Sequence, residues 1–357
     1  MTRTQPRVLR ANLAQRLDPS PLPRAPTPML ATLVAEPFDN RDWIFEPKFD
    51  GLRVLGVFDG RELTLLSRNG RPQNFQFPEI AEALRRALKQ PAVVDGEVVS
   101  FDPKGRTSFR ELQQRFHLQD AGEVEARRRE HPASVYLFDV LYAVRSDVTH
   151  LPLEERKRIL KQIVKWSQKI RWTDFSSAKG KLLFHRACRN GEEGIIGKHR
   201  QSRYVAGRSD RWVKFKCVGR QEFVIGGFTD PQRSRIGLGA LLVGYYDDGN
   251  RLLYAGKVGT GYSDSLLRDL RAQLDRLEQD RPPFDPAGPE PWRPAHWVKP
   301  KLVAEVAFGE WTQNHLLRQP RFEGLRPDKK PGDCRREKPK ALPAAARRSR
   351  SFHMLGG

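Results

Sequence analysis

The sequence predicts an α+β protein with two domains, and three observations support this prediction. The chain has 357 residues, which at about 150 residues per domain suggests two domains. Up to about residue 218, short runs rich in β-branched and aromatic residues alternate with stretches of helical periodicity. Beyond that point, several strand-like runs accompany a single amphipathic helix, which favours a small antiparallel barrel.

In the first block, Gly, Asn, Asp or Pro residues bound the strand-like runs. Apolar residues at helical spacing predict two helices, over residues 79–88 and 153–166. Pro152 precedes the second helix, where its missing N–H is harmless. The charge run at 123–130 is interpreted as a solvated helix face. Strands are expected at 52–58, 63–67, 92–101 and 134–142.

In the second block, Gly-containing turns separate the expected strands. Residues 263–277 form an amphipathic helix in this interpretation, with Ser263 or Asp264 as its cap and five leucines facing inward. Residues 281–300 contain seven prolines and are expected to be a loop. The expected strands lie at 222–229, 240–247, 252–258 and 297–308.

Charge and cysteine content limit the possible functions. The formal net charge is +21, which favours a polyanionic partner. Apolar runs are much shorter than the roughly 20 residues of a membrane span, so an integral membrane protein is not expected. The three cysteines, at 188, 217 and 334, are far apart in the sequence. We therefore expect no disulfide framework and a reducing compartment.

Both ends of the chain are basic. Residues 1–27 are Arg- and Pro-rich, and their prolines would interrupt the amphipathic helix of a transit peptide. They are expected to be a flexible lead-in. Residues 331–357 are poor in apolar residues until Phe352 and are expected to form a disordered tail.

The most specific local pattern is EPKFDGLR at 46–53. Its lysine, Lys48, is followed two residues later by Asp-Gly, which places an amine on a turn beside a carboxylate. A surface lysine in an Asp-Gly turn would explain KxDG alone. It does not explain the glutamate two residues before the lysine and the arginine five residues after it.

Further motifs follow in order: SRNG at 67–70, DGEVV at 95–99, YLFDVL at 136–141, EGIIGK at 193–198, WVKFK at 212–216 and RPDK at 326–329. Together they resemble the motif series of the nucleotidyltransferases that form covalent lysyl-nucleotides, which include ATP-dependent DNA ligases, RNA ligases and mRNA capping enzymes. The likeness is greatest to the ligase module of bacterial end-joining DNA ligases. It covers about residues 28–330 and includes EVAFGEWT at 305–312.

The resemblance implies a nucleotidyltransferase (ATP-grasp-like adenylation) domain at 28–218 and an oligonucleotide-binding-fold barrel at 219–330. It also implies ATP-dependent sealing of 5′-phosphate/3′-hydroxyl breaks in DNA, in repair by end joining. Lys48 would take AMP from ATP and pass it to the 5′-phosphate. The 3′-hydroxyl would then displace AMP.

The chemistry of the motif residues agrees with this mechanism. A lysine amine attacks phosphorus only when neutral, whereas a free lysine has a pKa of about 10.4. Lys198, Lys214, Lys216 and a divalent metal would lower that pKa and neutralise phosphate oxygens. Mg²⁺ or Mn²⁺ needs oxygen ligands, and Glu97 and Glu193 match the carboxylates of the family's motifs.

The resemblance also implies further roles. Glu46 would help to recognise adenine, Arg53 with Glu97 would hold the ribose, and Phe138 would stack on the base. A plain core position explains Phe138 equally well. Other motif residues would bind phosphate. Lys214 and Lys216 would contact the α-phosphate, and Arg68 would bind the 5′-phosphate of the nick. Arg208 is a weaker candidate for a phosphate contact. In the barrel, Arg326, Asp328 and Lys329 would orient the leaving pyrophosphate in a closed state.

Two other functions remain open at this point: an RNA ligase or capping-type guanylyltransferase with the same lysine chemistry, and a catalytically idle DNA-binding module. Neither a helical DNA-binding region nor polymerase and phosphoesterase modules are evident. We therefore expect the partners to be nicked or broken duplex DNA, a Ku-type end-binding protein and a separately encoded polymerase or nuclease. The protein is expected to be monomeric, cytoplasmic and nucleoid-associated, without membrane contact.

Overall fold

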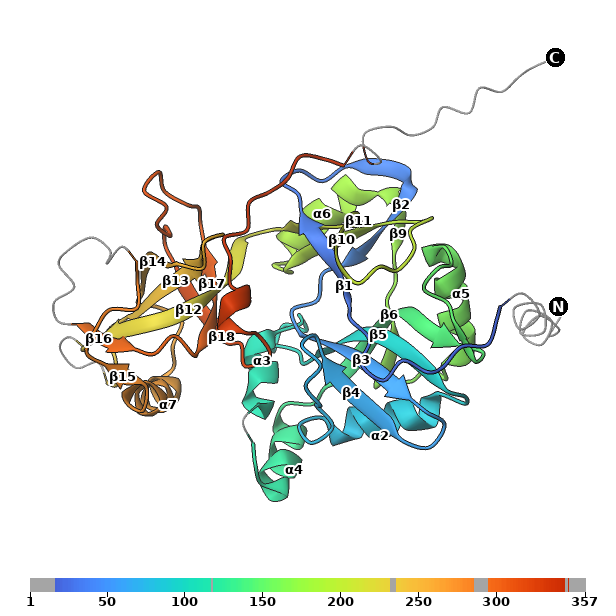
Figure 1. The fold of residues 1–357 in the computed structure, drawn as a ribbon, viewed down its shortest axis with the longest axis horizontal. Helices are drawn as coiled ribbons and strands as arrows, with labels where there is room; N and C mark the ends of the chain where they lie inside the picture. The colour runs from blue at the N-terminus through green and yellow to red at the C-terminus, as the bar shows by residue number, and fades with distance from the viewer. Residues whose placement is uncertain (1–16, 117, 232–235, 286–294, 344–345, 347–357) are drawn as a thin grey trace, which may run out of the picture. The chain divides into compact units, whose positions relative to one another are not determined.

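A computed structural model describes residues 17–116, 118–231, 236–285, 295–343 and 346 (Figure 1). The chain divides into two compact units. The first unit comprises Met1–Cys217 and Pro339–Gly357, and the second comprises Val218–Lys338. The chain therefore passes between the units twice. Each unit has its own hydrophobic core, so each is described separately.

The first unit contains a six-stranded sheet in the order β4-β3-β5-β6-β7, with β8 paired to β6. Helices α2 (Pro78–Ala87) and α5 (Leu153–Ile163) place an apolar stripe against this sheet, so Ile80, Leu84, Ile159 and Leu160 are buried in its core. The strands are β3 (Leu52–Phe58), β4 (Leu63–Ser67), β5 (Ala92–Val99), β6 (Ser134–Ala143), β7 (Ser146–Asp147) and β8 (Ile170–Trp172).

A five-stranded sheet, in the order β1-β11-β10-β2-β9, completes the first unit. Helix α6 (Gly180–Arg189) packs against β10 and β2 and buries Ala187 with Phe45 and Ile195. The strands are β1 (Met29–Leu33), β2 (Asp39–Pro47), β9 (Ser176–Lys179), β10 (Gly194–His199) and β11 (Gly207–Lys216). The remaining helices are α3 (Phe109–Leu112), η1 (Gln113–Arg115) and α4 (Ala121–Glu130).

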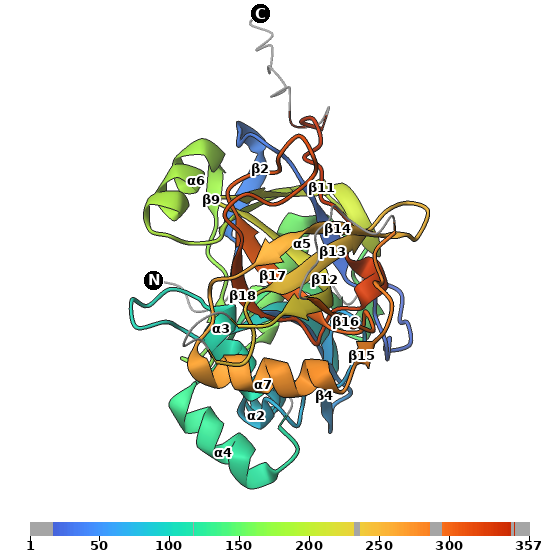
Figure 2. The ribbon, with the colours of Figure 1, turned by 90° about the vertical axis from the view of Figure 1, so that its left-hand side faces the viewer.

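The second unit is built on a seven-stranded sheet whose long strand β12 pairs with β13, β16 and β17. Helix α7 (Asp264–Asp275) lies beside these strands (Figure 2) and buries Leu267, Leu270 and Leu274 in their core. The strands are β12 (Gly219–Thr229), β13 (Leu241–Tyr246), β14 (Leu252–Val258), β15 (Glu278–Gln279), β16 (Ala295–Val298), β17 (Val303–Phe308) and β18 (Arg321–Leu325); η2 (Pro331–Asp333) follows.

The predicted α+β class is confirmed, and β3, β4 and β14 have the predicted bounds. Ser263 is the predicted cap of α7, since its hydroxyl accepts a hydrogen bond from the Leu266 amide at 3.4 Å. The single strand expected at 297–308 is wrong. Two strands, β16 and β17, stand there with a break that contains Pro300, which has no N–H to donate to a ladder. Strand β16 also begins inside the expected loop.

The described parts of both chain ends contact the fold. Leu17 is buried in the first core, and the Ser20 amide donates to the Arg145 carbonyl at 3.0 Å. At the other end, Cys334 is buried in the second unit, and Lys340 forms a bridge with Val34 in the first. These basic segments therefore belong to the units where they make contacts. Residues 1–16, 344–345 and 347–357 lie outside the described part.

The expectation of no disulfide is also wrong. Cys188, on α6, is bonded to Cys217, which directly follows β11. Strand β10 pairs with β11 and α6 packs on β10, so the fold brings together two residues that are 29 positions apart. Cys334 is a free, buried thiol.

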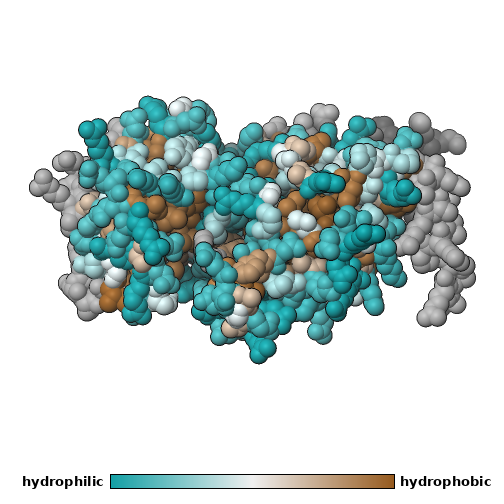
Figure 3. Space-filling model, turned by 60° about the horizontal axis from the view of Figure 1, so that its bottom comes forward, coloured by the Kyte–Doolittle hydropathy of each residue, from teal (hydrophilic) through white to brown (hydrophobic). Residues whose placement is uncertain are grey.

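Hydrophilic side chains predominate on the face shown in Figure 3, with separate hydrophobic patches between them. Within the described ranges, no helix has the length and apolar character that a membrane crossing requires.

Candidate active site

Lys48 directly follows β2, in the turn that leads to β3. Its amide donates to the Gly194 carbonyl at 2.9 Å, and its ammonium forms an ion pair with Glu193, which directly precedes β10. The antiparallel pairing of β2 with β10 brings these distant residues together. Gly51 is required here, because a Cβ at this position would lie 2.4 Å from the Val98 carbonyl oxygen. The sequence-predicted lysine and carboxylate thus meet in one place.

Glu46, on β2 and two residues before Lys48, lies between two lysines. The Lys198 ammonium from β10 lies 2.6 Å from one carboxylate oxygen. The Lys157 ammonium from α5 forms an ion pair with the other oxygen. The exposed fractions are 2% for Glu46, 2% for Lys198 and 4% for Lys157. One buried carboxylate therefore faces two buried ammonium groups.

Aromatic rings complete this pocket. The Lys198 ammonium lies 4.1 Å from the ring centre of Phe138 and 4.0 Å from that of Trp212. The Arg53 guanidinium lies 4.7 Å from the Phe138 ring centre. Burial lowers the pKa of Lys198 to about 8; Glu46 opposes this shift, and Lys157 adds to it. Two cations, Arg53 and Lys198, thus contact the Phe138 ring, for which the family resemblance implies stacking on the base.

Arg53 forms an ion pair with Asp95, which lies on the same strand, β5, as Glu97. Its Nε and Nη2 donate to the two carboxylate oxygens of Asp95 at 2.5 and 2.6 Å. Glu97 is the residue opposite Arg53 in the β3–β5 register. Burial alone would lower the pKa of Arg53, but the Asp95 carboxylate outweighs it and raises this pKa. The guanidinium is therefore held in one orientation and stays charged.

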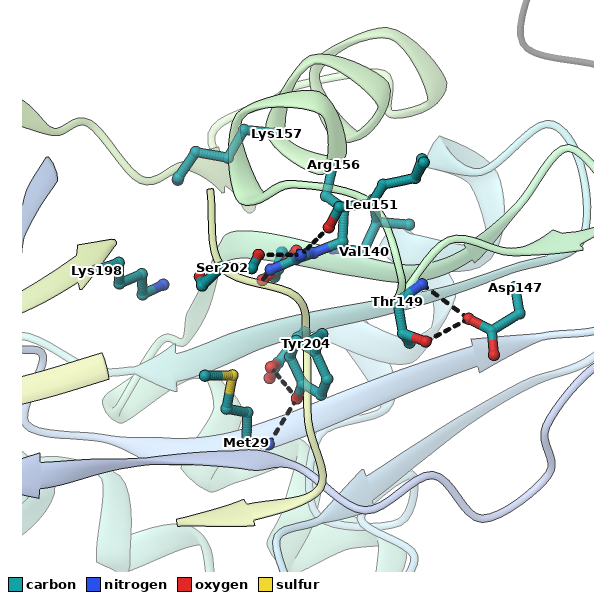
Figure 4. Close-up of polar contacts among 12 residues, drawn as sticks. Met29, Val140, Asp147, Thr149, Leu151, Arg156, Lys157, Lys198, Ser202 and Tyr204 are labelled. Atoms are coloured by element: carbon teal, nitrogen blue, oxygen red, sulfur yellow. Dashed lines mark hydrogen bonds and ion pairs between the residues drawn. The ribbon is translucent and has the colours of Figure 1, made fainter. Parts of the chain in front are cut away.

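Tyr204 is hydrogen-bonded to the Asp95 carboxylate of this pair and to the Met29 amide (Figure 4). Its hydroxyl donates to Asp95 Oδ2 at 2.7 Å and accepts from the Met29 amide at 3.0 Å. Burial is the largest cause that raises the pKa of Tyr204 well above its usual value, so the hydroxyl keeps its proton. Asp95 is fully buried. The buried Asp95 carboxylate thus accepts hydrogen bonds from both Arg53 and Tyr204, and the Arg53 guanidinium lies over the Phe138 ring.

Strand β11 carries three of the predicted phosphate contacts. Lys214 and Lys216 are register partners of Ile196 and Gly194 on β10, which places them beside the strand that begins after Glu193. Arg208, near the start of β11, donates to the Ala31 carbonyl at 2.8 Å. Arg68 is partly exposed in the turn after β4. Lys214 and Lys216 thus lie on the sheet that carries Lys48, whereas Arg68 lies on the other sheet.

The last predicted motif lies in the second unit and forms a compact ion cluster. Arg326 donates to Glu305 at 2.8 Å and, through two nitrogens, to Asp328 at 2.8 and 2.9 Å. The Lys329 ammonium lies 2.8 Å from Glu222. Burial raises the pKa of Asp328, but Arg326 outweighs burial and the net pKa is lowered. The structure thus brings the three motif residues together within this unit.

Sequence reasoning missed Lys157, Asp95 and Tyr204. Lys157 lies in a helix crowded with charges, LEERKRIL, where a cation looks like part of a solvated face. Asp95 stands inside the DGEVV motif, from which only the glutamate was assigned a role. Tyr204 lies between β10 and β11 in no motif. Only the Asp95 position carried an indication in the sequence, as a second carboxylate in a motif of known chemistry.

Two family models match the chain. One, described as ATP dependent DNA ligase domain, matches residues 28–216. The other, described as ATP dependent DNA ligase C terminal region, matches residues 234–329. The first match alone covers more than half of the chain.

Several curated proteins are similar over most of the chain. The multifunctional non-homologous end joining protein LigD of Pseudomonas aeruginosa is 35% identical over 329 residues, which are 91% of this chain and 38% of that protein. A DNA ligase of Hyperthermus butylicus is 31% identical over 343 residues, which are 86% of this chain and 56% of that protein. The chain thus spans about two fifths of the length of the LigD relative.

Among solved structures, the mycobacterial DNA ligase D complexed with ATP and MES matches with a TM-score of 0.63 and 34% identity. The match covers 87% of this chain and 98% of that chain. Together with the family models, it confirms the predicted fold, a nucleotidyltransferase domain followed by an oligonucleotide-binding-fold domain.

Proposed function

Because the chain belongs to the ATP-dependent DNA ligase family, we propose that it seals 5′-phosphate/3′-hydroxyl breaks in duplex DNA through a lysyl-AMP intermediate. The observation that carries the proposal is the ion pair between Lys48 and Glu193 beside the Glu46 pocket. This arrangement holds one amine, 19% exposed, next to a buried pocket with both a carboxylate and cations.

Sealing takes place in three steps. The Lys48 amine attacks the α-phosphorus of ATP, a nitrogen–phosphorus bond forms, and pyrophosphate leaves. The 5′-phosphate oxygen of the break then attacks the same phosphorus and releases Lys48. Finally the 3′-hydroxyl attacks the 5′-phosphate and AMP leaves. Glu193, already paired with the Lys48 ammonium, orients this side chain before the first step.

The first unit binds the nucleotide in this proposal. Phe138 stacks on the base, Glu46 contacts its edge, and Arg53 with Glu97 holds the ribose. The rigid support of Arg53 by Asp95 favours this role, because a fixed guanidinium needs no reorganisation when the nucleotide binds. Lys214 and Lys216 bind the α-phosphate, and Arg208 supplies a further phosphate contact.

A divalent cation, Mg²⁺ or Mn²⁺, would be held by Glu193 and Glu97. Within the described residues, no group of three or more His, Cys, Asp or Glu side chains could hold a metal ion. Two carboxylates suit an ion that takes its remaining oxygens from phosphate and water. When bound, such an ion neutralises phosphate charge and favours attack at phosphorus.

The second unit supplies Arg326, Asp328 and Lys329 to orient the pyrophosphate during self-adenylation. Arg68 binds the 5′-phosphate of the break. The net charge of +21 supports binding of duplex DNA through its phosphates. DNA affinity should therefore fall steeply as the salt concentration rises. Binding measured over a range of about 50 to 200 mM salt would test this.

We assign the biological role to double-strand-break repair by end joining. A Ku-type end-binding protein and separate polymerase or nuclease activities are the proposed partners. The multifunctional relative is named for non-homologous end joining, and this chain matches 38% of its length. Joining of blunt ends should therefore be slower than nick sealing until a Ku-type protein is added.

The test is Lys48→Ala, assayed with radiolabelled ATP and with a pre-adenylated nick. The variant should lose covalent labelling and sealing from ATP, while it retains part of the last step. Lys89→Ala, a change outside the motifs, is the control. Labelling of Lys48→Ala at the wild-type level would overturn the proposal. Preferential labelling of the wild type with GTP, or sealing of RNA alone, would favour a capping enzyme or an RNA ligase instead.

A further inference from the structure

Helix α5 carries a buried lysine, Lys157, that contacts Glu46. This lysine lies outside all the family motifs found in the sequence. The Lys157 ammonium pairs with Glu46 and lies 4.8 Å from the ring centre of Trp172 and 5.2 Å from that of Phe175. A buried lysine is unusual unless it is paired or has a function. Its two ring contacts and its ion pair fix the ammonium at the carboxylate.

The neighbouring residue fixes this turn of the helix (Figure 4). Arg156 is fully buried, and its guanidinium donates to both carboxylate oxygens of Asp139 at 2.8 and 2.9 Å. It also donates to the Leu151 and Ser202 carbonyls at 2.6 and 2.8 Å. Helix α5 is therefore tied to β6 and to the segment after β10, and Lys157 is carried on a rigid element.

The three charged groups of the pocket have unused hydrogen-bonding capacity. Glu46 Oε1, Lys157 Nζ and Lys198 Nζ are buried and make no well-aligned hydrogen bond to any described residue, although they lie at ion-pair distance. Buried polar atoms normally find a partner. These atoms are therefore arranged to contact a bound molecule that presents both donors and acceptors.

The edge of a 6-aminopurine fits this arrangement. Its exocyclic amine is a donor for a carboxylate oxygen, and the adjacent ring nitrogen is an acceptor for an ammonium. A 6-oxopurine has the reverse pattern, with an acceptor at position 6 and an N–H at position 1. It would direct an oxygen at the carboxylate, and a site with buried polar groups rejects such a ligand strongly.

Lys157 determines whether the Glu46 carboxylate and the Lys198 ammonium remain able to bind the base. With Lys157 removed, Lys198 is the single cation beside Glu46, and the two would close into one satisfied pair. With Lys157 present, one carboxylate oxygen is held from α5 and a positive charge is in excess. The second ammonium and the carboxylate can then face the base.

We infer that Lys157 is a positioning residue for base recognition: by holding Glu46 against α5, it sets the preference of the enzyme for a 6-aminopurine nucleotide over a 6-oxopurine nucleotide. This inference rests on the proposed function, since it concerns the nucleotide that adenylates Lys48. A purely structural Lys157, needed only to neutralise Glu46 during folding, would leave the preference unchanged.

The test compares Lys157→Met and Lys157→Arg in the full chain. Lys157→Met keeps the apolar stem against Trp172 and Phe175, and Lys157→Arg keeps the charge. Lys161→Met is the matched control, because Lys161 is exposed on the same helix and its ammonium lies 5.5 Å from the same Trp172 ring. Covalent labelling of Lys48 is measured over a range of ATP and inosine triphosphate concentrations, and thermal unfolding is recorded for each variant.

We expect Lys157→Met to raise the KM for ATP and to reduce the ATP/inosine triphosphate preference by about tenfold, with kcat little changed. Lys157→Arg should restore most of the preference, and Lys161→Met should match the wild type. An unchanged preference in Lys157→Met, or a preference lost equally in Lys161→Met, overturns the inference. If Lys157→Met does not fold, a Lys157→Arg variant that folds but has lost the preference overturns it as well. Absence of labelling in the wild type would instead overturn the proposed function itself.

Discussion

The two units each contain a buried cluster of charges, and the clusters differ in how completely they are satisfied. In the first unit, Glu46 faces two lysines, and the three groups keep unused hydrogen-bonding capacity. In the second unit, three nitrogens of Arg326 donate to the carboxylates of Glu305 and Asp328 within 2.9 Å. The first cluster is thus ready for a ligand, whereas the second is closed on itself.

This difference suggests that the two clusters have different roles: one binds a ligand directly, and the other must rearrange first. A cluster with unused donors and acceptors gains contacts when a ligand enters, without breaking any internal bond. A closed cluster must first lose internal ion pairs before its side chains can contact a phosphate. We therefore assign nucleotide recognition to the first unit, and to the second a contact made only in one step of the reaction.

The largest effect that would test this comparison is expected at Glu193. Glu193→Gln removes the charge that pairs with the Lys48 ammonium and the proposed metal ligand, so self-adenylation should fall by at least about 100-fold. Covalent labelling with ATP measures this loss, and added Mn²⁺ should restore only part of it. Glu192→Gln, at the preceding, half-buried position, is the control. Near-normal labelling of Glu193→Gln at limiting metal would show that the carboxylate serves the fold alone.

The next largest effect concerns the closed cluster. Arg326→Met leaves Glu305 and Asp328 buried without their cation, which should destabilise the second unit by about 3–5 kcal/mol. Lys329→Met removes a partly buried pair with Glu222 and should cost less than about 1 kcal/mol while self-adenylation falls. Denaturant unfolding and ATP labelling separate the two results. Equal stability losses in both variants would mean that Lys329 belongs to the structural core of the cluster.

Much of this contrast could be predicted from the sequence. Strands β3, β4 and β14 are short, largely apolar runs between turn residues, so their bounds follow from local preferences. Lys48, Glu193 and the Arg326 motif came from the resemblance, because family motifs keep the order and spacing of reacting groups. The motif series therefore predicted the site better than periodicity predicted the sheet that carries it.

The remaining features depend on contacts between distant segments. Lys157 acquires its proposed role only because α5 packs against β6 in a position that brings the Lys157 ammonium to Glu46 on β2. A charged helix does not reveal which of its cations is buried. The Cys188–Cys217 bond requires the pairing of β10 with β11 and the docking of α6. The described C-terminal segment contacts residues that are distant in the sequence. Cys334 packs in a core cluster of the second unit, and Lys340 pairs with Val34 in the first.

The cysteines distinguish the units at a smaller scale. The Cys188–Cys217 bond closes a loop across 29 positions, so its loss should destabilise the first unit by about 3 kcal/mol. In the second unit, burial raises the pKa of Cys334 to about 12, so this thiol should resist alkylation in the native protein. Thermal unfolding of the wild type and of Cys217→Ser, each with and without reductant, measures the stability that the disulfide contributes. A reductant effect that persists in Cys217→Ser would place its origin outside this disulfide.

The smallest effect is a pH dependence of nucleotide binding in the first unit. The groups facing Lys198 are Glu46 from β2, Lys157 from α5, Asp139 from β6, and the rings of Phe138 and Trp212. Burial, with Lys157 adding to it, lowers the pKa of Lys198 to about 8, whereas Glu46 and Asp139 oppose this shift.

An ammonium that donates to the base loses its proton as the pH rises through 8, so the KM for ATP should increase several-fold between pH 7 and pH 9. Stability should change in the opposite direction. From about pH 8 to the unfolded lysine pKa near 10.4, the unfolded chain binds more protons at this residue, so Lys198 makes the folded state more stable as pH rises. Lys198→Arg, which stays charged, should flatten the change in KM, and Lys161→Met should not. If the KM rises equally in Lys198→Arg, another group controls it, and the first cluster does not bind the base through this ammonium.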